Sequence, residues 1–130
     1  MNKTQKLIEE LDGLRKGSID EKVKEYITVI SMEYNLPCPP LSTACSDCWK
    51  DQLIFLKKEI LEKYQEDLGR KYILKGTVNV IWNGININPF TITDKLAKKY
   101  IKNGFNTYFF KTIPAKKTEQ DSKSEDNTKD

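Results

Sequence analysis

Histidine is absent from this 130-residue chain. Without an imidazole, the protein cannot build a Ser-His-Asp triad, a histidine general base or a metal site with histidine ligands. Other catalytic patterns are missing too: we find no glycine-rich phosphate loop, no GxSxG motif and no paired carboxylates at a convincing strand end. These absences argue against most enzyme classes, and the sequence predicts a protein that is not an enzyme.

Long apolar runs are also missing. The longest strictly apolar run covers only residues 53–56, far fewer than the roughly 20 residues that cross a bilayer. Charged residues at Lys3, Lys6 and Glu9 interrupt the N-terminus before a signal-peptide core can form. The three cysteines are an odd set, which does not suit a secreted disulfide scaffold. We therefore expect no membrane partner and a location in a reducing compartment such as the cytoplasm.

The charge is nearly balanced, with 22 basic and 19 acidic residues and a net charge of +3. Residues 115–130 hold four lysines and five acidic residues and no large apolar side chain. This composition predicts a disordered tail. The rest of the chain has a net charge of +4, which is only mildly basic for a nucleic-acid-binding protein.

Apolar residues recur at helical spacing in the first half of the chain and predict helices over about 3–16, 19–34 and 43–67. Gly17 is expected to end the first helix in a left-handed conformation. Gly69 is expected to end the third helix. Ser18 and Glu21 form a capping-box pattern for the second helix. Ser42 or Thr43 is expected to cap the third.

After Gly76 the apolar period changes from 3.6 to 2, which favours strands. Asn83-Gly84 predicts a type I′ hairpin that places Trp82 opposite Ile85 and Val80 opposite Ile87, on one face. A short helix over 94–102, capped by Thr93, and a strand over 105–113 follow. The expected fold is α+β, with a helical part (1–69), a β-hairpin–helix–strand module (70–114) and the tail.

The first candidate site comprises Cys38, Cys45 and Cys48. Zinc needs four ligands, so Asp47 or Asp51, or a thiol of a second subunit, would have to complete the site. We favour the alternative that the CxxC cysteines are small buried hydrophobes at the start of a core helix. Redox chemistry is a third interpretation, although a proline-rich segment stands where a thioredoxin-like site has a strand.

The second candidate is a lysine face on the fourth helix. Lys95, Lys98, Lys99 and Lys102 lie at i, i+3, i+4 and i+7, so all four point the same way. Such a basic strip can bind the phosphates of nucleic acid. The simpler interpretation is a solvated outer face.

The third candidate is the aromatic segment Tyr108, Phe109 and Phe110. In a strand it would be aromatic on both sides, which indicates either core packing on both faces or a protein interface. In the second case we expect Trp82 to belong to the same contact surface.

The turn and cap residues of the C-terminal half form a pattern: Val80 to Gly84, Thr93-Asp94-x-Leu96-Ala97, and Asn103 to Phe105 with Tyr108-Phe109. Together with Cys45-x-x-Cys48-Trp49, this pattern resembles short uncharacterised proteins from phages and prophages of Bacteroidota, over about residues 43–114. The resemblance implies a role in virion structure or assembly, and hence a location in the cytoplasm of a bacterial host or in a virion. It carries over no catalytic residue.

We therefore expect a non-enzymatic structural or interaction protein, oligomeric and associated with phage, with a protein partner or a second copy as its ligand. The alternatives are a nucleic-acid-binding module that uses the lysine helix and a zinc-stabilised protein-interaction module. No cofactor is expected apart from that zinc.

Overall fold

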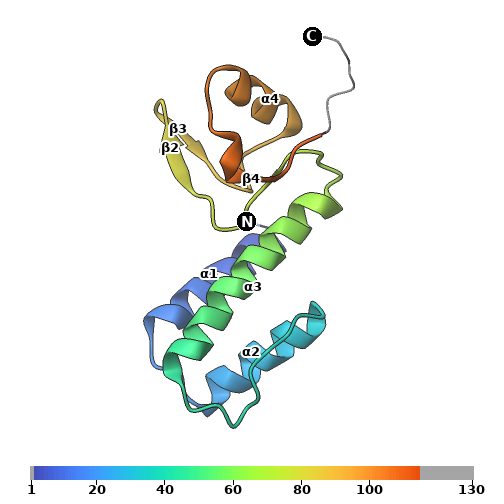
Figure 1. Ribbon diagram of the computed structural model, residues 1–130. Helices are drawn as coiled ribbons and strands as arrows, with labels where there is room; N and C mark the ends of the chain where they lie inside the picture. Colours follow the sequence, from blue (N-terminus) through green and yellow to red (C-terminus); the bar gives the residue numbers. More distant parts are fainter. Residues whose placement is uncertain (1, 115–130) are drawn as a thin grey trace.

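The computed structural model describes residues 2–114, so the tail predicted for 115–130 lies outside the described residues. The fold is α+β, as predicted. A long helix, α3 (Ser46–Asp67), runs through the helical part and reaches the smaller C-terminal module at its upper end (Figure 1). Within the described residues, no helix is long and apolar enough to cross a membrane.

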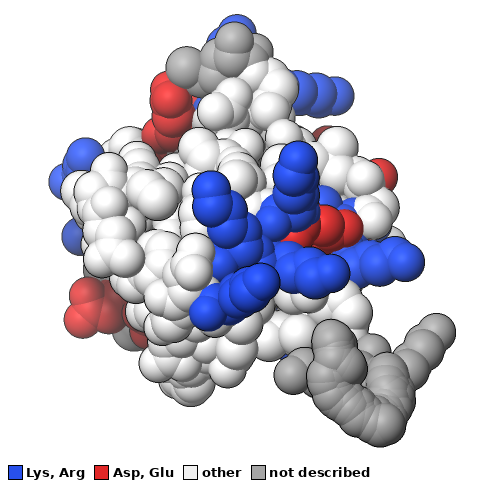
Figure 2. Space-filling model, turned by 90° about the horizontal axis from the view of Figure 1, so that it is seen from above, with Lys and Arg blue, Asp and Glu red and all other residues white. Residues whose placement is uncertain are grey.

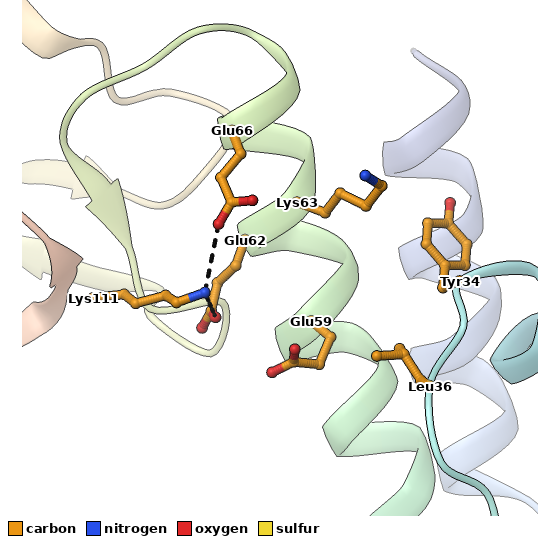
Figure 3. Close-up of a pocket in the computed structure, with 7 residues that line it drawn as sticks. All are labelled: Tyr34, Leu36, Glu59, Glu62, Lys63, Glu66 and Lys111. Carbon is orange, nitrogen blue, oxygen red and sulfur yellow. Dashed lines mark hydrogen bonds and ion pairs between the residues drawn. The ribbon is translucent and has the colours of Figure 1, made fainter.

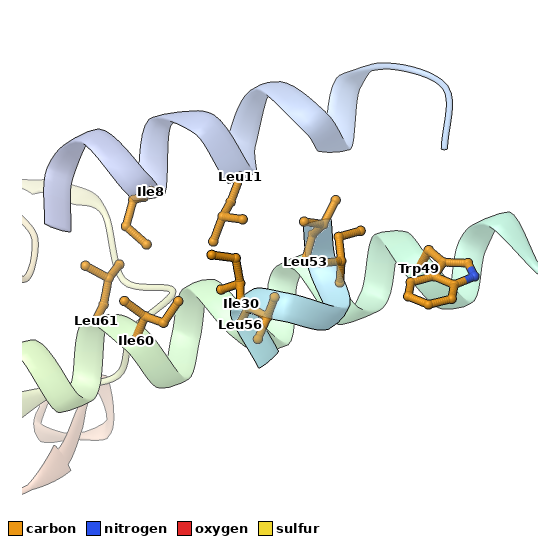
Figure 4. Packing of buried hydrophobic residues seen from close by; sticks show 9 residues of the cluster. Ile8, Leu11, Ile30, Trp49, Leu53, Leu56, Ile60 and Leu61 are labelled. Carbon is orange, nitrogen blue, oxygen red and sulfur yellow. The ribbon is translucent and has the colours of Figure 1, made fainter. Parts of the chain in front are cut away.

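Helices α1 (Lys3–Lys16) and α2 (Glu21–Glu33) pack against α3 around one apolar cluster. Side chains of α1 and α3 point toward one another along this interface (Figure 4). Burying one such Leu or Ile side chain stabilises the fold by about 1.5–3 kcal/mol. The buried members are Ile8, Leu11, Ile27, Ile30, Trp49, Leu53, Leu56, Ile60 and Leu61.

Two of the helix starts differ from the predictions. Asp20, not Ser18, caps α2: its carboxylate accepts a hydrogen bond from the Val23 N–H at 2.9 Å, and Asp is as good a cap as Ser. The start of α3 is capped by Cys45 rather than Ser42 or Thr43, because the helix begins about one turn later than expected.

The two predicted glycine stops have different outcomes. Gly17 has φ −107° and ψ −171°, so the chain leaves α1 in an extended conformation and the predicted left-handed stop is wrong. Gly69 has φ +79°, and its N–H donates to the Glu66 carbonyl at 2.9 Å. The predicted stop after α3 is therefore confirmed, and the structure shows that it is left-handed.

The predicted hairpin is confirmed in both its turn and its register. Strands β2 (Val80–Trp82) and β3 (Ile85–Ile87) pair with Val80 opposite Ile87 and Trp82 opposite Ile85. Asn83 and Gly84 have φ values of +51° and +78°, as a type I′ turn requires.

The last predicted strand, 105–113, is mostly wrong. Only β4 (Phe110–Thr112) is extended, and it follows a short 3-10 helix, η1 (Thr107–Phe109). The Asn106 side chain causes this break, because it accepts a hydrogen bond from the Tyr108 N–H at 2.8 Å and so starts the 3-10 turn. β4 pairs antiparallel with β1 (Ile73–Leu74), a strand that the sequence analysis missed.

The C-terminal module has its own apolar cluster beneath α4 (Asp94–Lys102). The two clusters are separate, although Phe90 of the module packs on the helical cluster, with its ring 5.2 Å from that of Tyr64. The buried members of the module's cluster are Leu74, Val78, Ile87, Ile92, Ala97, Tyr100, Phe105 and Phe110.

Polar side chains of α3 join the two parts of the protein. The buried amide of Gln65 donates to the Leu74 carbonyl and accepts from the Leu74 N–H, each at 2.9 Å. One turn earlier, the buried carboxylate of Glu62 accepts from the Gly76 N–H at 2.9 Å. A buried polar group needs such partners, so these bonds fix the module at the end of α3.

Candidate nucleic-acid interface

Helix α4 is short but well defined at both ends. Thr93 caps it as predicted, and its hydroxyl accepts a hydrogen bond from the Leu96 N–H at 3.2 Å. Gly104, with φ +103°, turns the chain away after the last turn. Ala97 and Tyr100 are buried beneath the helix. This packing fixes which side of α4 points outward.

The predicted lysine face is the outward side of this helix. Lys95, Lys98, Lys99 and Lys102 are all exposed. Seven residues separate the first from the last, so the row is about 10 Å long. None of the four forms an ion pair with another residue among 2–114. Within the described part of the chain, no acidic side chain neutralises their charges.

Basic residues are concentrated in the whole C-terminal module. Residues 70–114 contain eight lysines and arginines and a single acidic residue, Asp94, whereas residues 1–69 have a net charge of −3. The Asp94 carboxylate accepts hydrogen bonds from the Lys71 and Tyr72 N–H groups at 2.9 and 3.0 Å. It is thus engaged by backbone at the start of the module, and does not pair with the lysine row.

The segregation is visible from the side that carries α4. Figure 2 shows several lysine and arginine side chains gathered near the middle of this face, around a small acidic area. In Figure 1, α4 lies at the end of the molecule away from the helical part, with no other described element above it. The basic surface is therefore accessible from solution.

The aromatic residues of the third candidate site do not lie together at the surface of the described residues. Phe110 is buried, and Trp82 is half-buried with its ring 5.7 Å from Tyr100 and 5.4 Å from Phe105. Phe109 stacks on Phe105 at 5.2 Å. All three side chains pack in or against the module's apolar cluster. Phe109 and Phe110 reach it because the chain leaves the strand conformation at η1.

Tyr108 alone points outward, with 72% of its surface exposed. The Lys75 ammonium lies 3.5 Å from the centre of its ring, a cation–π contact. The aromatic segment is therefore divided, with its middle and last residues in the core and its first at the surface.

The CxxC cysteines are not the buried hydrophobes that we favoured. Cys45 and Cys48 are exposed and joined by a disulfide at the start of α3. Cys38 is half-buried elsewhere, with its Sγ 3.8 Å from the Thr28 hydroxyl. Among residues 2–114 the structure brings together no group of three or more Cys, Asp or Glu side chains suited to a metal ion. A zinc site stays a prediction.

A carboxylate-lined cavity of about 180 Å³ was not predicted. Glu59, Glu62 and Glu66 of α3 line it together with Lys111 of β4 (Figure 3). The Lys111 ammonium lies 3.3 Å from Glu62 and 3.5 Å from Glu66. Partial desolvation lowers the pKa of Lys111, but its bonds with the two carboxylates outweigh this and raise the pKa above its usual value. Because ion pairing satisfies these groups, we assign the cavity to the junction between α3 and the C-terminal module.

The sequence pattern contains no signal for this junction. Glu62 and Gln65 lie on a helix that already has a wide apolar stripe, and only the position of β1 makes them buried.

Comparisons with known protein families, with curated proteins and with solved structures found no match to this chain.

Proposed function

We propose that this chain is a non-enzymatic binding protein whose C-terminal module holds the phosphate backbone of a nucleic acid on the lysine face of α4. The observation that carries the proposal is the composition of residues 70–114, where eight basic residues stand against one acidic residue that backbone N–H groups already engage. An outer helix face that only needs solubility mixes both charge signs, and this one does not.

The dimensions of the lysine row suit a phosphate backbone. Its length of about 10 Å equals the rise of roughly three phosphate steps of one strand, measured along the duplex axis. Lys99 and Lys102 also lie in the last turn of α4, where positive charge is favoured by the helix dipole. The lysines therefore stabilise the helix that presents them.

The test is a salt titration of binding to a short duplex and to a single strand. Four phosphate contacts give a slope of log K against log salt of about −3.6 on the duplex and about −2.8 on the single strand. Between roughly 50 and 200 mM salt, duplex affinity should fall about 150-fold. Binding that is absent at low salt, or independent of salt, contradicts the proposal.

A matched pair of variants separates this face from general charge. K95Q/K98Q/K99Q/K102Q removes the row, and K3Q/K6Q/K16Q/K22Q removes four exposed lysines of the acidic helical part. Both variants lower the net charge by four, so a general loss of charge affects them equally. We expect only the first to abolish binding, because it alone removes the lysine face. Circular dichroism of both variants checks that the helices remain folded. Equal losses would refute a specific face.

A second candidate follows from the hairpin. Ile81 is 78% exposed and Ile85 is 38% exposed, in a two-stranded sheet whose outer edges pair with no other strand among residues 2–114. We propose that the protein self-associates through this hairpin. A structural or assembly role in phage particles stays a prediction. Light scattering at high protein concentration should give an oligomer that Ile81→Thr dissociates. A monomer would exclude it.

A further inference from the structure

The disulfide between Cys45 and Cys48 is accessible from solution. Both residues are exposed, so an external thiol can reach either sulfur. Their Cα atoms lie 5.2 Å apart, within the usual range for a disulfide. The i, i+3 spacing on a helix supplies this distance by itself, so the dithiol and the disulfide fit the same backbone.

The two sulfurs are not equivalent. Cys45 is the N-cap of α3, and its Sγ accepts a hydrogen bond from the Cys48 N–H at 3.1 Å. The N-terminus of this 22-residue helix carries partial positive charge, which stabilises an anion at the cap. Cys48 lies inside the first turn and has no such donor among the bonds of the described residues. Negative charge is therefore better placed on Cys45.

The residue that follows the pair holds the motif in place. Trp49 is fully buried in the helical cluster, and its indole N–H donates to the Thr43 carbonyl at 3.0 Å. This bond ties the segment before the CxxC motif to the first turn of α3. Opening the disulfide therefore leaves the local backbone anchored from both sides.

We propose that Cys45 and Cys48 form a reversible thiol–disulfide exchange site for small thiols of the glutathione class, independent of the nucleic-acid function. A thiolate attacks the Cys48 Sγ, which forms a mixed disulfide and expels Cys45 as a thiolate. A second thiol then attacks the sulfur of the external molecule. Cys48 leaves as a thiolate, and the two external thiol molecules are released joined by a disulfide. Two electrons and two protons pass to the protein, which ends as the dithiol.

The first test measures the equilibrium directly. The Cys38→Ser protein is incubated in buffers of reduced and oxidised glutathione, quenched with acid, alkylated and weighed by mass spectrometry. We expect one two-electron transition between disulfide and dithiol within the glutathione range. A pair that stays dithiol in fully oxidised glutathione, or stays disulfide in fully reduced glutathione, overturns the proposal.

The second test assigns the leaving sulfur. Single-cysteine proteins are compared: C38S/C48S keeps Cys45, C38S/C45S keeps Cys48, and C45S/C48S keeps Cys38. At about neutral pH, iodoacetamide should alkylate Cys45 at least about five-fold faster than either of the others, because its sulfur lies at the helix N-terminus and accepts the Cys48 N–H bond. Equal rates in folded proteins, or a faster Cys48, overturn the assignment. Denaturation in guanidinium should remove the difference in alkylation rate, because that difference depends on the folded α3 helix.

Discussion

Replacing Gly76 by alanine tests the contact that fixes the C-terminal module to α3. A Cβ atom at this position would lie 2.5 Å from the Cα of Lys58 and would collide with the Lys58 carbonyl oxygen as well. Side-chain Cβ atoms essentially never approach closer than 3.0 Å, and these neighbours are backbone atoms that cannot rotate away. The variant must therefore push β1 away from the helix.

The cost has two parts. Overpacking of a close contact costs about 1–3 kcal/mol. The shift also weakens the 2.9 Å hydrogen bond from the Gly76 N–H to the buried Glu62 carboxylate, and an unsatisfied buried group costs about 1–3 kcal/mol. Together these effects should lower the free energy of unfolding by about 2–6 kcal/mol, a large part of the 5–15 kcal/mol of a typical domain.

Urea denaturation, followed by circular dichroism and tryptophan fluorescence, measures this loss. Gly13→Ala is the control, because Gly13 lies in the exposed interior of α1 and a Cβ there meets nothing within 4 Å. Alanine should stabilise that helix by about 0.5–1 kcal/mol. Both variants replace glycine by alanine. A loss of stability in one and a gain in the other therefore isolates the effect of the contact with the Lys58 backbone. An unchanged urea midpoint for Gly76→Ala would refute the reasoning.

Three further predictions concern single residues. Gln65→Ala leaves the buried N–H and carbonyl of Leu74 without their partner, and thermal or urea unfolding should show a loss of about 2–4 kcal/mol. Burial, followed by the hydrogen bond to Glu10 and its charge, raises the pKa of Tyr26 from 10.0 to about 12. The folded state thus holds this proton more tightly, so its contribution to stability is complete below pH 10 and is lost as the pH rises toward 12. In an ultraviolet titration of phenolate, Tyr26→Phe should lack one late-titrating tyrosine that the parent protein has. Gly84→Ala forces a Cβ into φ +78° and should cost about 1–2 kcal/mol, measured as a lower melting temperature.

Local signals in the sequence were sufficient for the helices and the hairpin. Asn83 and Gly84 specify a turn by their own backbone preferences, and the register follows from that turn alone. The helix starts were predicted less well, because Ser18 and Asp20 are competing caps two residues apart and both are good ones. Choosing between them depends on the packing of the first turn, which no local pattern contains.

Non-local pairing explains the other errors. β1 has two residues and no alternating pattern, and it exists because β4 and Gln65 supply partners from distant positions. Asn106 converts the predicted strand into a 3-10 turn, and this moved Phe109 and Phe110 into the core. The lysine face was predicted correctly as exposed, because helical spacing alone places its four members on one side.

The amide of Gln65 acts as a one-residue substitute for a neighbouring strand. β1 offers Phe110 one of its edges, and at Leu74 the opposite edge is occupied by this side chain. An unpaired edge is a template on which another extended chain can be added. Since Gln65 blocks that template, another extended chain cannot be added on this side of β1, and Gln65→Leu should open this edge as a route to aggregation.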